Sequence, residues 1–244
     1  MKMWQQNIEN QFPGPGFGNK RGIGLAIAKT LADSPKHLCI LTARDPGREE
    51  AAVETLRKEG LEATLNQLDI GDPASVERFA SEIETEYGRC DVLVNNAGIA
   101  FKGSDPTPFQ MQAEPTLQTN FFDTFAFTEI MLPLLRKSKK GRVVNVASGA
   151  GSLSILNTQR WRKAFTAPDL TKEQLSSMMS TFVEDVKAGR HESEGWPSTC
   201  YGMSKLGLIA YTTKQRAVVK ATTGPFSCFL GRTSRPHYGS VVLF

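Results

Sequence analysis

The chain has 244 residues, 40% of them hydrophobic, which is enough to bury the core of one large α/β domain or two small ones. No stretch approaches the ~20 apolar residues of a membrane span, and the first residues lack the apolar core of a secretory signal, so we expect a cytoplasmic protein without a membrane partner. Five of the 29 basic residues and none of the 25 acidic residues lie after residue 213, so the body of the chain is near neutral and nucleic-acid binding is not expected.

The first part of the chain predicts a glycine-rich turn followed by a helix. Gly18, Gly22 and Gly24 have the spacing G-x-x-x-G-x-G, and apolar residues from Leu25 to Leu31 continue at helical spacing. Such a turn normally joins a buried strand to the helix, so that backbone N–H groups at the helix N-terminus meet a pyrophosphate. Here the preceding segment is polar and then contains two prolines, so the first strand is expected to be atypical or missing.

Strands and helices alternate over the next part of the chain. Apolar runs predict buried strands, and amphipathic or charged runs predict the helices between them. The strands are expected at 37–43, 63–70, 90–98 and 141–149, and the helices at about 47–60, 73–88 and 115–137. This alternation is typical of a doubly wound parallel sheet, in which ligands bind beyond the carboxyl ends of the strands.

Residues 152–198 interrupt this alternation. Within them five apolar residues recur at helical spacing and predict a helix laid on the surface: Leu175, Met178, Met179, Phe182 and Val186. Another helix is expected from about residue 201 to residue 220, and the sequence beyond it has no clear period. We therefore expect one Rossmann-like α/β domain over 1–244, with a helical insertion at 152–198, and with 1–17 and 214–244 poorly matched to the fold.

The cysteines are scattered along the chain at Cys39, Cys90, Cys200 and Cys228. They form no C-x-x-C pair and have no set of histidines nearby, so we expect neither a zinc site nor a disulfide framework. We interpret them as reduced thiols that fill space. Cys200 lies next to Tyr201 and would be reactive if it were exposed.

Tyr201 and Lys205 form a Y-x-x-x-K pair, which a helix places on one face. A free phenol has a pKa of ~10, and an adjacent ammonium favours the phenolate and brings that pKa toward neutrality. Tyr201 would then be the general acid that protonates a carbonyl oxygen as hydride arrives. The pair alone is a weak signal, because in most helices that carry it the tyrosine is half-buried and the lysine is solvated.

Two polar residues add to this pair. Ser148 ends an apolar strand, where its hydroxyl would hydrogen-bond the same carbonyl oxygen; the alternative is a serine that caps the next segment. Asn120 lies in an otherwise apolar helix. It is either a satisfied core amide or the holder of a water that connects Lys205 to solvent.

Five motifs in this order resemble the short-chain dehydrogenase/reductase family: "GNKRGIG" at 18–24, "NNAG" at 95–98, Asn120, Ser148 and "YGMSK" at 201–205. The long interval before Tyr201 is similar to that of the NADPH-dependent carbonyl reductases of this family. The resemblance implies that Ser148, Tyr201 and Lys205 are catalytic, with Asn120 completing the set. It also implies a monomer, because the inserted helix covers the surface that relatives use to form oligomers.

The residue after the second expected strand favours NADP(H). NAD is usually held by an acid at this point, whereas a 2′-phosphate is best held by a guanidinium. Ala43 stands in the acid's place, Arg44 follows it, and Arg21 adds a second cation in the glycine turn. With the residues that the resemblance adds, the expected cofactor site contains Gly18, Arg21, Gly22, Ile23, Gly24, Arg44, Asp69, Ile70, Asn96, Ala97, Gly98, Tyr201 and Lys205, and no metal.

The sequence therefore predicts an NADPH-dependent reductase of ketones, aldehydes or quinones, with a small carbonyl compound as its partner. Phe101 and Trp196 are candidate walls of the substrate pocket or ordinary packing residues. One alternative is an impaired isoform, from splicing or a mispredicted gene, that lacks effective NADPH binding and acts through protein contacts. It rests on the missing first strand and on the residues after Thr213, where no family-like strand is legible. A second alternative, an NAD-linked alcohol oxidant, is disfavoured by Arg44.

Overall fold

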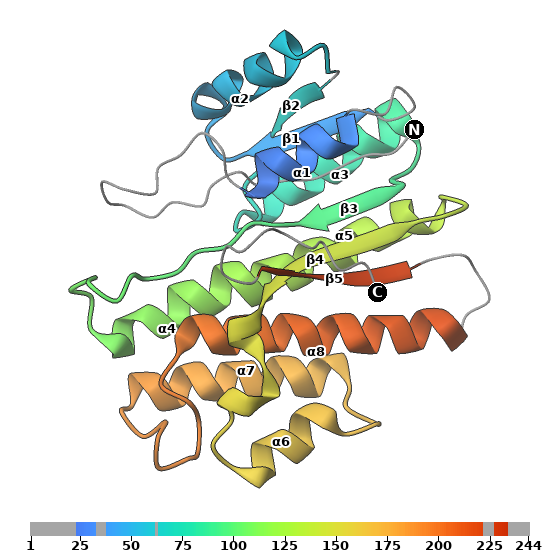
Figure 1. The fold of residues 1–244 in the computed structure, drawn as a ribbon. Helices are drawn as coiled ribbons and strands as arrows, with labels where there is room; N and C mark the ends of the chain where they lie inside the picture. The colour runs from blue at the N-terminus through green and yellow to red at the C-terminus, as the bar shows by residue number, and fades with distance from the viewer. Residues whose placement is uncertain (1–22, 33–37, 62, 222–226, 234–244) are drawn as a thin grey trace. The chain divides into compact units, whose positions relative to one another are not determined.

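The computed structural model describes residues 23–32, 38–61, 63–221 and 227–233 (Figure 1). The chain divides into two compact units. Unit 1 comprises Met1–Gly98, Thr124–Val144 and Gly224–Ser227, and unit 2 comprises Ile99–Asp123, Asn145–Thr223 and Cys228–Phe244. The single-domain assignment made from the sequence stays a prediction, and the segment expected to lack a first strand lies outside the described residues.

Unit 1 contains strands that alternate with helices, as the sequence predicts. In chain order its elements are α1 (Ile23–Ala32), β1 (Cys39–Ala43), α2 (Pro46–Lys58), β2 (Ala63–Gln67), α3 (Pro73–Tyr87), β3 (Val92–Asn95) and α5 (Thr124–Arg136). Strands β1 and β2 pair in parallel, with Cys39 opposite Ala63 and Ala43 opposite Gln67. All five residues of β1 are buried, which explains its unbroken apolar sequence.

Local signals explain where these elements begin and end. Helix α3 begins at Pro73, where the missing proline N–H costs nothing, and the Asp72 side chain accepts a hydrogen bond from Ala74 N. It ends at Gly88, whose φ of 69° is a left-handed conformation that glycine adopts without strain. Helices α1 and α2 bury apolar side chains against β1 and β2, and this cluster includes Leu25, Ala28, Leu41, Val53, Leu56 and Ala63.

The described strands form two sheets. One is β1–β2, and the other has the order β3–β4–β5, where β4 is Arg142–Ser148 and β5 is Ser227–Thr233. The expectation that no strand is legible beyond residue 213 is corrected by β5, which contains the apolar run Cys228–Leu230. Its short apolar run lies next to polar residues and gives no alternation, so the sequence pattern did not reveal it.

The helix expected at 115–137 begins earlier and is interrupted. Helix α4 spans Phe109–Leu117, a π-helix, η1, spans Gln118–Asp123, and α5 follows. Pro115 resembles a helix start in sequence, but it lies inside α4, where the neighbouring Thr116 and Leu117 are buried. A π-helix adds one residue to a turn and leaves no spacing signal in a single sequence.

The remaining elements of unit 2 are two short 3₁₀ turns and three helices. They are η2 (Gly149–Gly151), η3 (Leu153–Ile155), α6 (Gln159–Thr166), α7 (Lys172–Lys187) and α8 (Cys200–Ala221). Helix α7 begins with a capping box between Thr171 and Gln174 and buries four of the five predicted apolar residues, while Met178 is half-buried. It packs against both α4 and α8 (Figure 1). The predicted helical insertion is therefore present, and α6 is a further helix in it.

Trp196 anchors the end of the insertion. Its side chain is fully buried, stacks on Trp161 with ring centroids 3.6 Å apart, and meets the Phe182 ring edge-on at 5.7 Å. Its indole N–H donates to Asp185 Oδ2 at 2.8 Å, while Asp185 Oδ1 accepts from Arg190 Nε at 2.6 Å. Of the two interpretations of Trp196, the structure supports packing inside the insertion.

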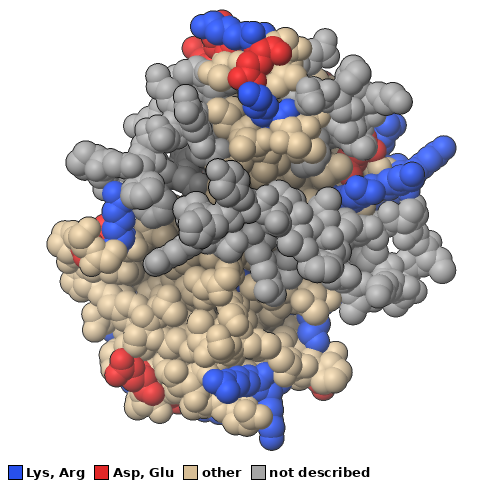
Figure 2. All heavy atoms as spheres, in the orientation of Figure 1, with Lys and Arg blue, Asp and Glu red and all other residues tan. Residues whose placement is uncertain are grey.

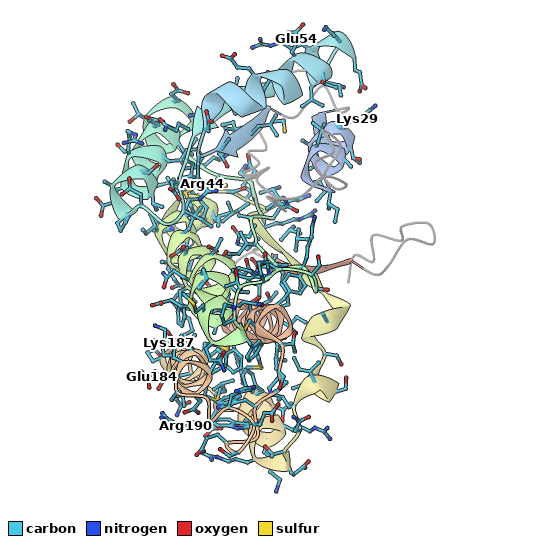
Figure 3. The ribbon with its side chains drawn as sticks, turned by 90° about the vertical axis from the view of Figure 1, so that its left-hand side faces the viewer. Lys29, Arg44, Glu54, Glu184, Lys187 and Arg190 are labelled. Carbon is cyan, nitrogen blue, oxygen red and sulfur yellow. The ribbon has the colours of Figure 1, made fainter. Side chains whose placement is uncertain are left out.

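We predict that Asp185→Ala lowers the free energy of unfolding by about 1–3 kcal/mol, because it leaves the buried Trp196 N–H without its acceptor. Glu184→Ala is the matched control: this acid lies beside Asp185 on α7 and is exposed, near Lys187 and Arg190 in Figure 3. Urea denaturation of both variants measures the difference. Equal stability of the two would show that the Trp196–Asp185 hydrogen bond contributes little.

Candidate active site

The four residues predicted to be catalytic all lie in unit 2. Asn120 is on η1, Ser148 ends β4, and Tyr201 and Lys205 occupy the first turns of α8. The Asn120, Ser148 and Lys205 side chains are buried, whereas Tyr201 is half-buried. Of this group, Tyr201 therefore has the side chain with the greatest access to a ligand.

Ser148 has two roles in the geometry. Its Oγ accepts a hydrogen bond from Ala150 N at 3.2 Å, which caps the 3₁₀ turn η2. The same hydroxyl hydrogen-bonds the Tyr201 side chain, and this bond favours the phenolate. The structure therefore supports the capping interpretation of Ser148, and its role in an active site stays a prediction.

The electrostatics of Tyr201 differ from the sequence-based expectation. Burial raises the pKa of Tyr201 above its ordinary value, and the hydrogen bond with Ser148 opposes this shift in part. Lys205, whose Nζ lies 5.6 Å from the centroid of the Tyr201 ring, does not bring the pKa of Tyr201 below its ordinary value, contrary to the expectation. The phenol therefore stays protonated at neutral pH, as a general acid requires.

Lys205 is held in the interior of unit 2. Its Nζ donates to the carbonyl oxygen of Val146, in β4, at 3.0 Å. Burial lowers the pKa of Lys205 to about 8, because the charged form loses its hydration. At neutral pH the ammonium is still the major form, but it releases its proton far more readily than an exposed lysine does.

Asn120 holds the main chain of a neighbouring segment. Its Oδ1 accepts from Ile99 N at 2.7 Å, and its Nδ2 donates to Ile99 O at 2.8 Å and to Ser204 Oγ at 3.0 Å. Both Nδ2 hydrogens therefore go to protein atoms. Of the two sequence-based interpretations of this side chain, the satisfied core amide is the one that the geometry supports.

The turn after β4 lies directly against the main chain of α8. A Cβ atom added at Gly151 would lie 2.6 Å from the carbonyl carbon of Lys205 and 2.7 Å from the nitrogen of Leu206. Only a glycine permits this approach, which sets the path of the chain between Ser148 and α8. A Cβ added at Gly149, in the same turn, would meet nothing within 4 Å.

The expected cofactor residues that are described lie mainly in unit 1. Ile23 and Gly24 open α1, and Arg44 is exposed directly after β1, where Figure 3 labels it. The described loop after β2 is held by Asp69, whose Oδ1 accepts from Gly71 N at 2.9 Å. Ile70, Asn96 and Ala97 share the lining of one cavity of about 10 Å³, and Gly98 follows. Gly18, Arg21 and Gly22 lie outside the described residues.

The described residues support neither a reactive thiol at Cys200 nor a metal site. Cys200 is buried, and burial raises its pKa to about 12, so the condition for a reactive thiol is not met. Within the described ranges no group of three or more His, Cys, Asp or Glu side chains is placed to hold a metal ion. None of the helices in these ranges combines the length and apolar character needed to cross a membrane.

Comparison with known proteins agrees with the motifs. The family model for short chain dehydrogenases matches residues 17–161. The chain belongs to the short-chain dehydrogenase family, and its fold is the Rossmann-like α/β fold of that family.

The curated relatives of this chain include proteins named carbonyl reductase (NADPH). Carbonyl reductase (NADPH) 1 of Pongo abelii is 45% identical over 192 residues, which cover 78% of this chain and 69% of that protein. Carbonyl reductase (NADPH) 3 of Mus musculus is 45% identical over 196 residues, which cover 80% and 70%. The structure of salutaridine reductase from Papaver somniferum superposes with a TM-score of 0.78 at 27% identity and covers 93% of this chain and 85% of that one.

We predict that Gly151→Ala lowers both thermal stability and any reductase activity, because its Cβ has no space against the main chain of α8. Gly149→Ala should change both much less. Melting temperature and turnover of the two variants test this. A Gly151→Ala protein that matches Gly149→Ala in both would mean that the turn relaxes without disturbing Ser148.

A second prediction concerns pH. The folded pKa of Lys205, about 8, lies below its ordinary value of 10.5, so the unfolded chain binds more protons between these values and stability rises with pH there. The stability from this group is complete above the unfolded pKa and is lost as pH falls through the folded pKa. In the parent chain, Lys205 should raise the free energy of unfolding by roughly 1 kcal/mol per pH unit between pH 8 and 10. Lys205→Met should lack this rise.

The buried thiols have the opposite effect on the pH dependence of stability, and comparing Lys205→Met with the parent chain removes this effect because both proteins contain these thiols. Their raised pKa values make stability fall at high pH in both proteins. Parallel stability curves for the parent and Lys205→Met would show that the pKa of Lys205 is not lowered.

Proposed function

We propose that this protein reduces ketones, aldehydes or quinones with NADPH, and that Ser148, Tyr201 and Lys205 perform the reaction with Asn120 as their support. The observation that carries the proposal is the hydrogen bond between Ser148 and a half-buried, protonated Tyr201. The similar proteins named carbonyl reductase (NADPH) support the same reaction class.

The described residues fit NADPH. The Arg44 guanidinium is exposed after β1 and suits a 2′-phosphate, while Ala43 leaves no carboxylate at that position to repel it. Ile23 and Gly24 open α1, whose N-terminal backbone N–H groups suit a pyrophosphate. Asp69, Ile70 and Asn96–Gly98 would line the rest of the dinucleotide site, and Gly18, Arg21 and Gly22 would complete it. When bound, NADPH supplies the hydride.

Tyr201 supplies the proton in the proposed mechanism. Its hydroxyl, kept protonated by burial, donates to the carbonyl oxygen of the substrate as negative charge develops there. The Ser148 hydroxyl hydrogen-bonds the same oxygen and orients it. After transfer, the hydrogen bond from Ser148 stabilises the phenolate, and the Lys205 ammonium lies over the Tyr201 ring, 5.6 Å from its centroid.

We further propose that the protein is a cytoplasmic monomer with neither nucleic acid nor membrane as a partner. Helix α7 covers faces of α4 and α8, which removes them as surfaces for association. Met179 of α7 lies so close to Gly207 of α8 that a Cβ there would come within 2.8 Å of its methyl carbon. At the top of Figure 2, over unit 1, described Lys and Arg side chains lie next to Asp and Glu side chains, which does not favour polyanion binding there.

A titration with NADPH, followed by nicotinamide fluorescence, tests the proposal first. Saturable binding and oxidation of NADPH that depends on an added ketone, aldehyde or quinone are expected. Absence of both would mean that this chain is the impaired isoform and not a reductase.

Tyr201→Phe should reduce carbonyl reduction by on the order of 10²-fold or more, because the transition state loses its proton donor, while NADPH affinity stays nearly unchanged. Tyr211→Phe is the matched control, since it removes a buried phenolic hydroxyl from the same helix. Steady-state rates and NADPH titrations separate the two effects. Retention of more than half of the parent rate by Tyr201→Phe would place the chemistry elsewhere.

Arg44→Asp should reverse the cofactor preference from NADPH toward NADH, because a carboxylate repels the 2′-phosphate and accepts a hydrogen bond from the ribose hydroxyl. Arg57→Asp makes the same charge change at an exposed position on α2 and should leave the preference unaltered. Affinities of both variants for NADPH and NADH give the ratio directly. An unchanged ratio in Arg44→Asp would remove this residue from the cofactor site.

A further inference from the structure

The Ser204 hydroxyl lies at the centre of a chain of hydrogen bonds in unit 2. It donates to the main-chain oxygen of Tyr201 at 2.8 Å, and it accepts from Asn120 Nδ2 at 3.0 Å. Both Ser204 and Asn120 are fully buried. The motif "YGMSK" contains Ser204, but the sequence alone assigns it no role.

The donor and acceptor roles in this chain of hydrogen bonds are fixed by the main-chain groups at its two ends. A main-chain carbonyl oxygen only accepts, so the Ser204 proton must point to Tyr201 O, and a Ser204 lone pair is left for Asn120. The Asn120 NH₂ group then faces both Ser204 Oγ and Ile99 O, and Oδ1 faces the N–H of Ile99. A flipped carboxamide would set two donors against each other at Ile99.

The same contact brings η1 close to α8. A Cβ added at Gly207, one turn beyond Ser204, would lie 2.9 Å from a ring carbon of Phe121, the neighbour of Asn120. The π-helix therefore packs tightly on the helix that carries Tyr201 and Lys205. Ile99 directly follows the predicted cofactor segment Asn96–Gly98 in the chain.

We propose that Ser204 is a positioning residue, whose hydroxyl anchors Asn120 on α8 and so connects the main chain of Tyr201, through Asn120, to Ile99. It touches neither substrate nor cofactor and acts through Asn120 and the first turns of α8. Its importance for turnover rests on the proposed carbonyl reductase function, whereas its effect on Asn120 and Ile99 does not.

Helix α8 contains a matched control. The Thr212 hydroxyl donates to Leu208 O at 2.7 Å and accepts from Asn145 Nδ2 at 2.8 Å, and both partners of this pair are fully buried. This is the same arrangement as that of Ser204 and Asn120, placed two turns further along the helix. Thr212→Val removes an equivalent hydroxyl without touching the chain of bonds to Ile99.

The first measurement is amide hydrogen exchange of Ile99 by NMR in the unliganded protein. In Ser204→Ala, exchange of Ile99 should be about 10-fold faster or more, because its acceptor Asn120 is no longer anchored on α8. Ser204→Cys keeps the volume with a much weaker hydrogen bond and should give the same direction of change. Ser204→Thr keeps the hydroxyl and should restore slow exchange, and Thr212→Val should leave Ile99 unchanged.

The second measurement is steady-state carbonyl reduction. Ser204→Ala should lower kcat by roughly 10-fold with little change in the KM for NADPH, since misplacement of the acid affects the transition state more than binding. Thr212→Val should change neither parameter. If kcat is unaltered in Ser204→Ala, Ser204 is not a positioning residue for the reaction.

The exchange data separate the two proposals. Unchanged exchange of Ile99 in Ser204→Ala, or equal acceleration by Thr212→Val, overturns the positioning of Asn120 whatever the activity. Faster exchange in Ser204→Ala alone, in a parent chain that reduces no carbonyl compound, supports that positioning and overturns the proposed function.

Discussion

The contact between the main chain of η2 and the main chain of α8 is the constraint on which the candidate site depends. No side chain separates the two backbones at Gly151, so the turn that follows β4 lies on the surface of the helix itself. Ser148 precedes this turn, and Tyr201 and Lys205 lie on the facing part of α8. The hydrogen bond between Ser148 and Tyr201 and that between Lys205 and Val146 both follow from this close approach.

Burial dominates the electrostatics of these residues. It shifts the pKa of Tyr201 upward and the pKa of Lys205 downward, so each group is moved toward its neutral form. Only the hydrogen bond from Ser148 acts in the opposite direction on Tyr201. Tyr201 and Lys205 are neighbours on α8. In the protein without a ligand, the charge on one of these side chains is nevertheless not compensated by a charge on the other.

Much of the fold follows from periodicity, and the departures have identifiable causes. The apolar spacing from Leu175 to Val186 predicts α7 because its buried face is continuous. The start of α4 was missed because Pro115 resembles a helix start, and η1 was missed because a π-helix has no sequence spacing of its own. Strand β5 was missed because its apolar run is short and does not alternate.

Family motifs identify residue types in a fixed order, and they name Asn120, Ser148, Tyr201 and Lys205 as candidates whose catalytic roles stay a prediction. The sign of the Tyr201 pKa shift could not be predicted, since spacing on a helix shows which residues are neighbours but not how deeply they are buried. Ser204 was equally hidden, because its partner Asn120 is 84 residues away in the chain. Gly151 has no motif signal at all, and only the position of α8 shows why a side chain is excluded.

The deep placement of the thiols has a consequence for the compounds that such an enzyme would meet. Thiolates attack quinones and reactive aldehydes, and Cys200 lies next to the proposed proton donor. Burial raises the pKa values of Cys39 and Cys200 to about 12 and that of Cys90 still further, so these three thiols stay protonated and weakly nucleophilic at neutral pH. Electrophilic compounds near Tyr201 therefore meet no reactive sulfur in Cys200, which protects the candidate site from alkylation.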